Sequence, residues 1–141
     1  MKAKEYLYQI PKIHTKIQNK KERIARLAHL LQTPAMQSYQ SDKVRTSVST
    51  DKMGRMIAEK ITLEEDLQRL YYQEAELIIR IGRQIDGLSK PEHSRLLHLK
   101  YEEHMTLREI ASVMNYEYIT IRKMHGAALK AFTDMYQNSI H

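Results

Sequence analysis

Two long stretches of this chain repeat apolar residues at alternating spacings of three and four, and this repeat limits the possible fold more than any other feature. The first stretch runs from Ala3 to Leu31, and the second runs from about Lys52 to Leu88. Residues three and four apart share one face of a helix, so the repeat predicts long amphipathic helices of coiled-coil type. With one Phe, no Trp and four Gly, the chain offers little from which to build a sheet. We therefore expect an all-α fold.

Pro11 interrupts the first stretch. Because proline costs about 3 kcal/mol inside a helix, we expect either a kink there or a helix that begins near Ile10 with proline in its first turn. The remaining face of this stretch is a basic ridge. It is either a solvated helix face or a surface for phosphates or an acidic partner. The ridge consists of Lys12, Lys16, Lys20, Lys21, Arg23 and Arg26.

The apolar stripe of the second stretch is wider than one neighbouring helix can cover. We expect the first helix to fold back over it as an antiparallel hairpin, and the surplus surface to pair with a second subunit in a homodimer or higher homo-oligomer. Asp51 is the expected N-cap. The acidic run from Glu64 to Asp66 is expected beside basic residues of the first helix. The residues that widen the stripe are Ile57, Ile61, Tyr71, Ile78 and Ile85.

Between the two stretches, residues 32–51 lose the apolar repeat and are rich in Ser, Thr and Gln. We interpret this segment as a linker or a long loop. Lys43 and Arg45 are candidates for phosphate contacts if the loop orders against DNA. The alternative is a disordered hinge.

The segment from Gly87 to Pro91 marks the clearest boundary. Gly87 suits a helix C-cap, Ser89 suits the next N-cap, and Pro91 is tolerated in a first turn. We therefore divide the chain into a helical hairpin and oligomerisation region, 1–88, and a small domain, 89–141. A helix from Pro91 to about Glu102 is expected to complete the core of that domain, because two helices alone bury too little surface.

The rest of the small domain has the pattern of a helix, a tight turn and a second helix. Thr106 and Glu109 form a capping box, so the first helix should begin at Leu107. Asn115 tolerates the left-handed conformation that a turn requires. Apolar residues at helical spacing then predict a second helix of three or four turns. These residues are Ile121, Met124, Ala128 and Phe132.

A two-helix unit of this size is most often a DNA reader whose second helix lies in the major groove. The alternative is an ordinary helical hairpin. Arg122 and Lys123 suit guanine edges or phosphates, while Tyr118 and Thr120 suit phosphates or thymine methyl groups. Glu117 lies on the same face.

The charge of the chain favours a nucleic-acid partner, with a formal net charge of +6. The excess lies mainly in residues 1–31, which hold 8 Lys and Arg against 2 Asp and Glu. Residues 89–141 hold 7 against 6. Because phosphate neutralisation supplies most non-specific affinity, we expect the small domain alone to bind weakly.

The run RLLHLKYEEHMTLREIASVMNYEYITIRKMHGAALKAF resembles region 4 of sigma-70-type factors. The whole chain resembles the phage-encoded ArpU/RinA-type family of late-gene transcription regulators, through EYLYQI, SDKVRTSVSTDKMGRMI and LKYEEHMTLREIASVMNYEYITIRKMHGAAL. This resemblance implies a sigma-region-4-like helix-turn-helix that binds double-stranded DNA and controls late or packaging genes in a bacterial host. It also implies a role for His125, at the base of the domain or on a phosphate. The DNA-binding residues that we expect are Thr106, Arg108, Glu117, Tyr118, Thr120, Arg122 and Lys123.

Other functions stay open, namely a sigma-like factor that binds host RNA polymerase and a coiled-coil adaptor without DNA binding. No catalytic constellation or cofactor motif is found, so we expect no enzyme and no cofactor. The chain has no Cys, and none of its seven His has ligand spacing, so we expect no metal. No stretch approaches the roughly 18 apolar residues of a membrane helix. We therefore expect a cytoplasmic protein without a membrane partner.

Overall fold

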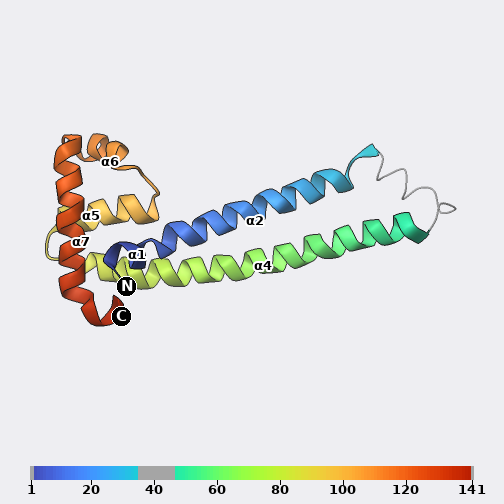
Figure 1. Cartoon of the computed structure of the whole chain (residues 1–141), viewed down its shortest axis with the longest axis horizontal. Helices are drawn as coiled ribbons and strands as arrows, with labels where there is room; N and C mark the ends of the chain where they lie inside the picture. Colours follow the sequence, from blue (N-terminus) through green and yellow to red (C-terminus); the bar gives the residue numbers. More distant parts are fainter. Residues whose placement is uncertain (1, 35–46, 141) are drawn as a thin grey trace. The chain divides into compact units, whose positions relative to one another are not determined.

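The computed structural model describes residues 2–34 and 47–140, and every element in these residues is helical (Figure 1). The predicted all-α class is therefore confirmed. Packing divides the chain into unit 1, Met1–His14 with Gln73–His141, and unit 2, Thr15–Tyr72. In the sequence, the two units meet at His14/Thr15 and at Tyr72/Gln73, whereas the sequence-based boundary lies between residues 88 and 89. The elements are α1 (Ala3–Leu7), α2 (Gln9–Leu31), α4 (Ser47–Asp86), α5 (Pro91–Leu97), the π-helix η1 (His98–Glu102), α6 (Leu107–Met114) and α7 (Tyr118–Ile140).

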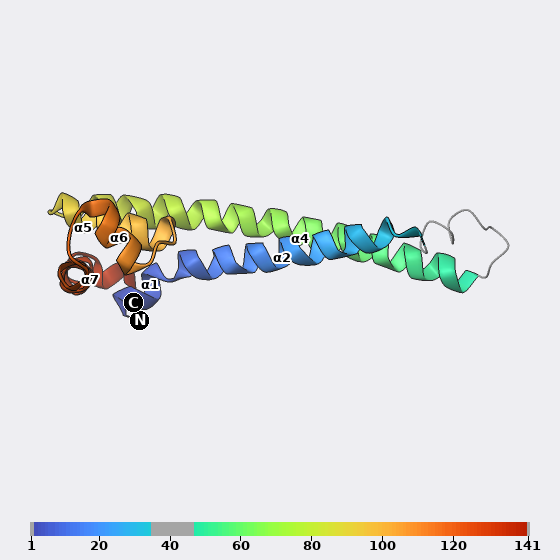
Figure 2. The same ribbon diagram turned by 90° about the horizontal axis from the view of Figure 1, so that it is seen from above.

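Unit 2 is formed by parts of α2 and α4, which run alongside each other (Figure 2). Ile17 and Leu63 are buried in it. Lys20 Nζ lies 3.9 Å from a carboxylate oxygen of Asp66, and an ion pair of 3.7 Å joins Arg23 to Glu59. Residue numbers rise along α2 as they fall along α4. The two ion pairs thus agree with the predicted antiparallel hairpin, and they use two residues of the basic ridge.

The start of α4 differs from the prediction. The helix begins at Ser47, so Asp51 lies inside it and is not its N-cap. Ser, Val and Thr lower helix stability by only tenths of a kcal/mol each, roughly 0.5 kcal/mol at most, so a long helix can extend through them. The predicted loop 32–51 therefore ends earlier than expected. Lys43 and Arg45 lie outside the described residues.

Pro11 lies in the first turn of a helix, as predicted. Helix α1 ends at Leu7 and α2 begins at Gln9, which makes Pro11 the third residue of α2. In this position proline removes an N–H that has no partner within its own helix. The Lys12 N–H next to it donates to the Tyr8 carbonyl oxygen at 3.0 Å.

Unit 1 is organised around α7, against which α1, α5 and α6 pack. The Phe132 side chain is fully buried. Its ring centroid lies 5.8 Å from that of Tyr6 in α1 and 4.8 Å from that of Tyr136. The Tyr6 hydroxyl also donates to Gln84 Oε1 of α4 at 2.7 Å. Figure 1 shows α1 near the C-terminal end of α7, so segments far apart in sequence share one core.

The predicted helix from Pro91 to about Glu102 is present, but its second part is the π-helix η1. Pro91 occupies the first helical position, as expected. The prediction of Ser89 as N-cap is wrong, because Lys90 is the N-cap and has no side-chain cap bond. A proline forces the residue before it into an extended conformation, and an N-cap needs that conformation.

Gly87 directly follows α4, as predicted. Glycine is needed there for a different physical reason than the predicted helix C-cap. No glycine in the described residues has a positive φ, so a left-handed cap does not account for it. A Cβ atom at Gly87 would overlap the hydroxyl oxygen of Tyr136. Glycine therefore allows α7 to approach the end of α4 closely.

We expect Gly87→Ala to lower the free energy of unfolding by about 1–3 kcal/mol, the usual cost of overpacking. The added methyl group meets the Tyr136 hydroxyl, so Tyr136→Phe should recover part of this loss in the double variant. Urea unfolding followed by circular dichroism measures both effects.

Gly54→Ala is the matched control, because nothing lies within 4 Å of a Cβ built at this helical position. It should stabilise the protein by up to about 1 kcal/mol. If the double variant is no more stable than Gly87→Ala, the overlap with Tyr136 is not the cause.

Candidate nucleic-acid interface

The helix and turn at the centre of the candidate interface form as the sequence predicts. The Glu109 N–H donates to Thr106 Oγ at 3.2 Å, and the Thr106 N–H donates to Glu109 Oε1 at 3.1 Å. The capping box is thereby confirmed, and α6 begins at Leu107. The Glu109 carboxyl accepts hydrogen bonds from the backbone N–H and the side chain of Thr106, and these bonds hold its pKa below its usual value. Asn115 ends α6 in the left-handed conformation, with φ 59° and ψ 44°.

Helix α7 follows after the turn and packs against α6 through small and apolar residues. Ile110 of α6 and Ile121 of α7 are fully buried, and Ala111 is 6% exposed. A small side chain at Ala111 permits the close crossing expected from the sequence. The predicted length of α7 is wrong, because the helix extends beyond Phe132 to Ile140 and is interrupted at Tyr136. Its added turns supply Tyr136 and Ile140 to the core of unit 1.

The predicted DNA-binding residues lie at the surface of the two helices. The side chain of Arg108, in the first turn of α6, lies over the Tyr118 ring, with Cζ 4.2 Å from the ring centroid. A cation–π contact of this kind fixes the position of the guanidinium. The structure thus brings together two candidates from different helices. Tyr118 is half-buried, and the exposed candidates are Thr106, Arg108, Glu117, Thr120, Arg122 and Lys123.

The exposed face of α7 contains three further residues that the sequence analysis missed. Ile119 is 55% exposed, Gly126 has open space where a Cβ would point, and Lys130 is exposed. Together with Lys123 they lie along one line of the helix, because the spacing is four, three and four residues. Ile119, Arg122 and Lys123 also line a shallow hollow of about 220 Å³. The helical period could have revealed this line, but the sequence-based prediction covered only the polar and charged residues near the start of the helix.

His125 packs inside the domain, so of its two predicted roles the phosphate contact is wrong. Its side chain is 9% exposed, and Nε2 lies 3.0 Å from the Tyr101 hydroxyl. Burial, followed by the nearby Lys100 and Lys4, lowers the pKa of His125 to about 4. Burial raises the pKa of Tyr101 to about 12. At neutral pH a protonated Tyr101 hydroxyl and an uncharged His125 imidazole therefore share this hydrogen bond.

The other histidines form no metal centre in the part of the chain that the structure describes. The rings of His14 and His104 stack at a centroid distance of 4.0 Å. Burial and the neighbouring His14 lower the pKa of His104. His98 lies with Nε2 2.7 Å from an Asp86 oxygen. Within the described ranges, no helix combines the length and apolar character needed to cross a membrane.

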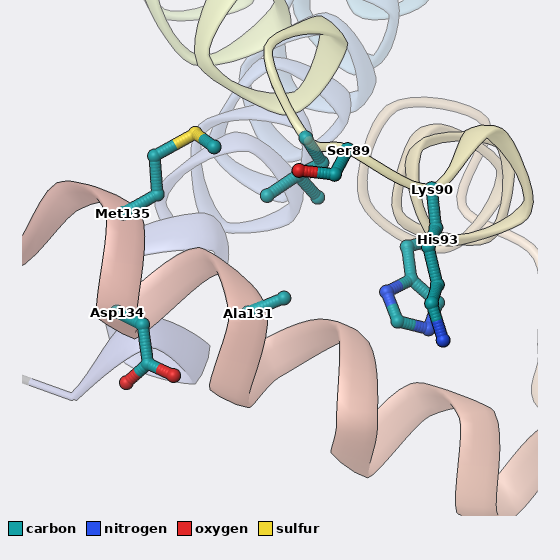
Figure 3. Close-up of a pocket in the computed structure, with 7 residues that line it drawn as sticks. Ser89, Lys90, His93, Ala131, Asp134 and Met135 are labelled. Carbon is teal, nitrogen blue, oxygen red and sulfur yellow. The ribbon is translucent and has the colours of Figure 1, made fainter.

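A separate hollow of about 380 Å³ lies between α5 and α7 (Figure 3). Lys90 and His93 lie on one side of Ala131, and Asp134 and Met135 lie on the other. The hollow contains none of the predicted DNA-binding residues. It is therefore distinct from the exposed face of α7.

Comparison of the chain with known protein families, with curated proteins and with solved structures finds no match.

The buried His125 should make the stability of the protein depend on pH. Its pKa is about 4 in the folded protein and 6.5 for a free side chain. Between pH 6.5 and pH 4, the unfolded chain therefore binds a proton at His125 and the folded chain does not. The free energy of unfolding thus falls as the pH drops through this range. We expect a loss of roughly 1–2 kcal/mol between pH 7 and pH 5 from this residue.

Gln at position 125 can accept from the Tyr101 hydroxyl or donate to it, but it does not titrate. The loss of stability between pH 7 and pH 5, from urea unfolding, should thus be smaller in His125→Gln than in the wild type. His29→Gln replaces an exposed histidine and serves as the control. If the wild type, His125→Gln and His29→Gln lost the same stability between pH 7 and pH 5, the pH dependence could not be assigned to His125.

Proposed function

We propose that this protein is a phage-type transcription regulator that binds double-stranded DNA through α6, the turn and α7. The observation that carries the proposal is the exposed face of α7, where Arg122 and Lys123 lie beside Ile119. Arginine and lysine bind guanine edges and phosphates, and an apolar side chain can contact a thymine methyl group. These are the contacts that a helix in the major groove makes.

The start of α6 supports the same proposal. Arg108 is held over Tyr118, which orders its guanidinium before any ligand arrives. Thr106 is exposed at the start of α6, so its hydroxyl can exchange the Glu109 carboxylate for a phosphate oxygen as its hydrogen-bond acceptor. Contacts of this type fix the register of a protein on DNA, while the second helix reads the bases.

The line formed by Ile119, Lys123, Gly126 and Lys130 (the α7 outer line) also suits close approach to a phosphate backbone. Gly126 adds no side chain to this line, and Lys130 extends the positive charge along the helix. Glu117 is the one acidic candidate, and a carboxylate there can accept a hydrogen bond from the cytosine N4 amino group. We therefore include the α7 outer line in the proposed interface.

The regulatory part of the proposal rests on the resemblance to the ArpU/RinA-type family and to sigma region 4. Under this reading, the protein acts in a bacterial host on late or packaging genes. Two alternatives remain: the protein binds RNA polymerase, or the helix pair has a purely structural role. The following experiment distinguishes both from sequence-specific DNA binding.

We expect the full-length protein to enrich one sequence motif from a pool of random and phage-derived duplexes. The double variant Arg122→Ala/Lys123→Ala should lose this enrichment, because each base contact is worth about 1–3 kcal/mol. Affinity for the enriched duplex should fall at least roughly tenfold, as measured by fluorescence anisotropy at two salt concentrations.

Lys21→Ala/Arg26→Ala is the matched control, since it removes two exposed cations from α2. It should lower affinity for all duplexes alike and leave the motif unchanged. If this control loses binding while Arg122→Ala/Lys123→Ala keeps it, the contact lies on the basic ridge. The absence of any DNA binding would overturn the proposal and favour a protein partner.

A further inference from the structure

Helix α4 has a second apolar stripe that is separate from its buried face. We define the second stripe as Ile57, Ile61, Gln68, Tyr72, Ala75 and Ile79, all of them exposed. Tyr72 is 73% exposed, and Ile79, Ile61 and Ile57 are 56%, 51% and 41% exposed. At 3.6 residues per turn, the second stripe lies about 140° around the helix from the buried Leu63 and Ile81.

The spacing of the second stripe is typical of a helix that pairs with another helix. Its members follow one another at intervals of four, seven, four, three and four residues, and Glu64 occupies the gap between Ile61 and Gln68. A seam with such intervals keeps one face towards a partner helix over many turns. Single exposed apolar residues are ordinary, but five of them on one helix face, interrupted by Glu64 and Gln68, indicate an interaction surface.

The second stripe is complementary to itself when the helix direction is reversed. If two copies of α4 run antiparallel about Gln68, Ile57 faces Ile79 of the second copy, and Ile61 faces its Ala75. Glu64 then faces Tyr72 of the second copy, whose hydroxyl can donate to the carboxylate. Each apolar pair occurs twice about the axis, so this register buries apolar side chains of both copies and suits a symmetric dimer. We propose that the second stripe binds a second copy of the chain, α4 against α4, in this antiparallel register.

Charge selects the antiparallel direction over the parallel one. In a parallel pair in register, Glu64 would lie against Glu64 of the second copy, and like charges in contact are unfavourable. In the antiparallel pair, Glu65 instead faces Arg69 of the second copy on the same flank of the seam. Glu65 forms no ion pair within the described residues, so its carboxylate is available for this contact, in which Arg69 would be shared with Asp66 of its own helix.

Gln68 supplies the register. Its amide meets the same amide of the second copy at the symmetry axis, where the two groups can donate to and accept from each other. A polar residue at one position of an apolar seam costs stability in every other register and so fixes the pairing. The dimer does not depend on the proposed DNA binding, and it can be tested without DNA.

Disulfide cross-linking of full-length variants tests the register, because the chain has no Cys of its own. Gln68→Cys should form a disulfide-linked dimer under mild oxidation. Ile61→Cys alone should not, since its two copies lie about 20 Å apart along the antiparallel helices. A mixture of Ile61→Cys and Ala75→Cys should cross-link. Gln73→Cys, an equivalent exposed glutamine away from the second stripe, is the matched control.

A change of charge on the second stripe tests the dimer itself. By sedimentation equilibrium, the wild type should be a dimer at micromolar concentration, and Ile61→Glu should raise the dissociation constant about tenfold or more. Thr62→Glu adds the same charge to the neighbouring face and should leave the dimer intact. Circular dichroism should show unchanged helix content in both variants, because both positions are exposed in one copy.

A monomeric wild type overturns the proposal. The proposal is also overturned if Ile61→Cys alone gives as much disulfide-linked dimer as its mixture with Ala75→Cys. That result would require parallel helices. Loss of the dimer in Thr62→Glu but not in Ile61→Glu also overturns it, since the interface would then lie on another face of α4. Failure of DNA binding leaves all of these outcomes unchanged.

Discussion

The burial of Phe132 is the interaction on which unit 1 depends. A helix, a turn and a second helix leave too much apolar surface in water to be stable by themselves, so α7 needs further neighbours. They come from both directions along the sequence, with Tyr6 of α1 on one side of the Phe132 ring and Tyr136 close by. The same contacts orient α7, so its outward residues occupy fixed positions before any ligand binds. The exposed face is thus a product of packing on the opposite side of the helix.

Features of the fold that depend on neighbours in sequence were predictable. The capping box of Thr106 and the left-handed Asn115 need only residues a few positions away, and Pro11 restricts its own turn. Features that depend on distant residues were not. The glycine at position 87 is explained by the approach of Tyr136, and no local pattern contains that contact. At Lys90 the following proline sets the N-cap by holding the backbone extended, and this effect outweighs the greater capping ability of the nearby Ser89.

The candidate interface shows the same division between local and tertiary information. Helical period placed Arg122 and Lys123 on one exposed face, and the structure agrees. The contact between Arg108 and Tyr118 requires the crossing of two helices and could not be read from spacing. For His125 the sequence left two roles open, packing at the base of the domain or contact with a phosphate, and only the structure shows that it is buried. Its actual partner, Tyr101, comes from the π-helix before the pair. The width of the apolar surface on α4 was visible in sequence, but only the structure separates the buried face from the second stripe.

The division of the chain into units has a kinetic consequence. Unit 1 joins residues on both sides of unit 2, and the hydrogen bond from Tyr6 to Gln84 spans 78 positions of the sequence. Closing so long a loop costs conformational entropy before any contact compensates for it. An antiparallel hairpin holds its two open ends close together, so prior folding of Thr15–Tyr72 would shorten the effective loop. The hairpin would then act as an internal folding template that speeds assembly of the helices on either side of it.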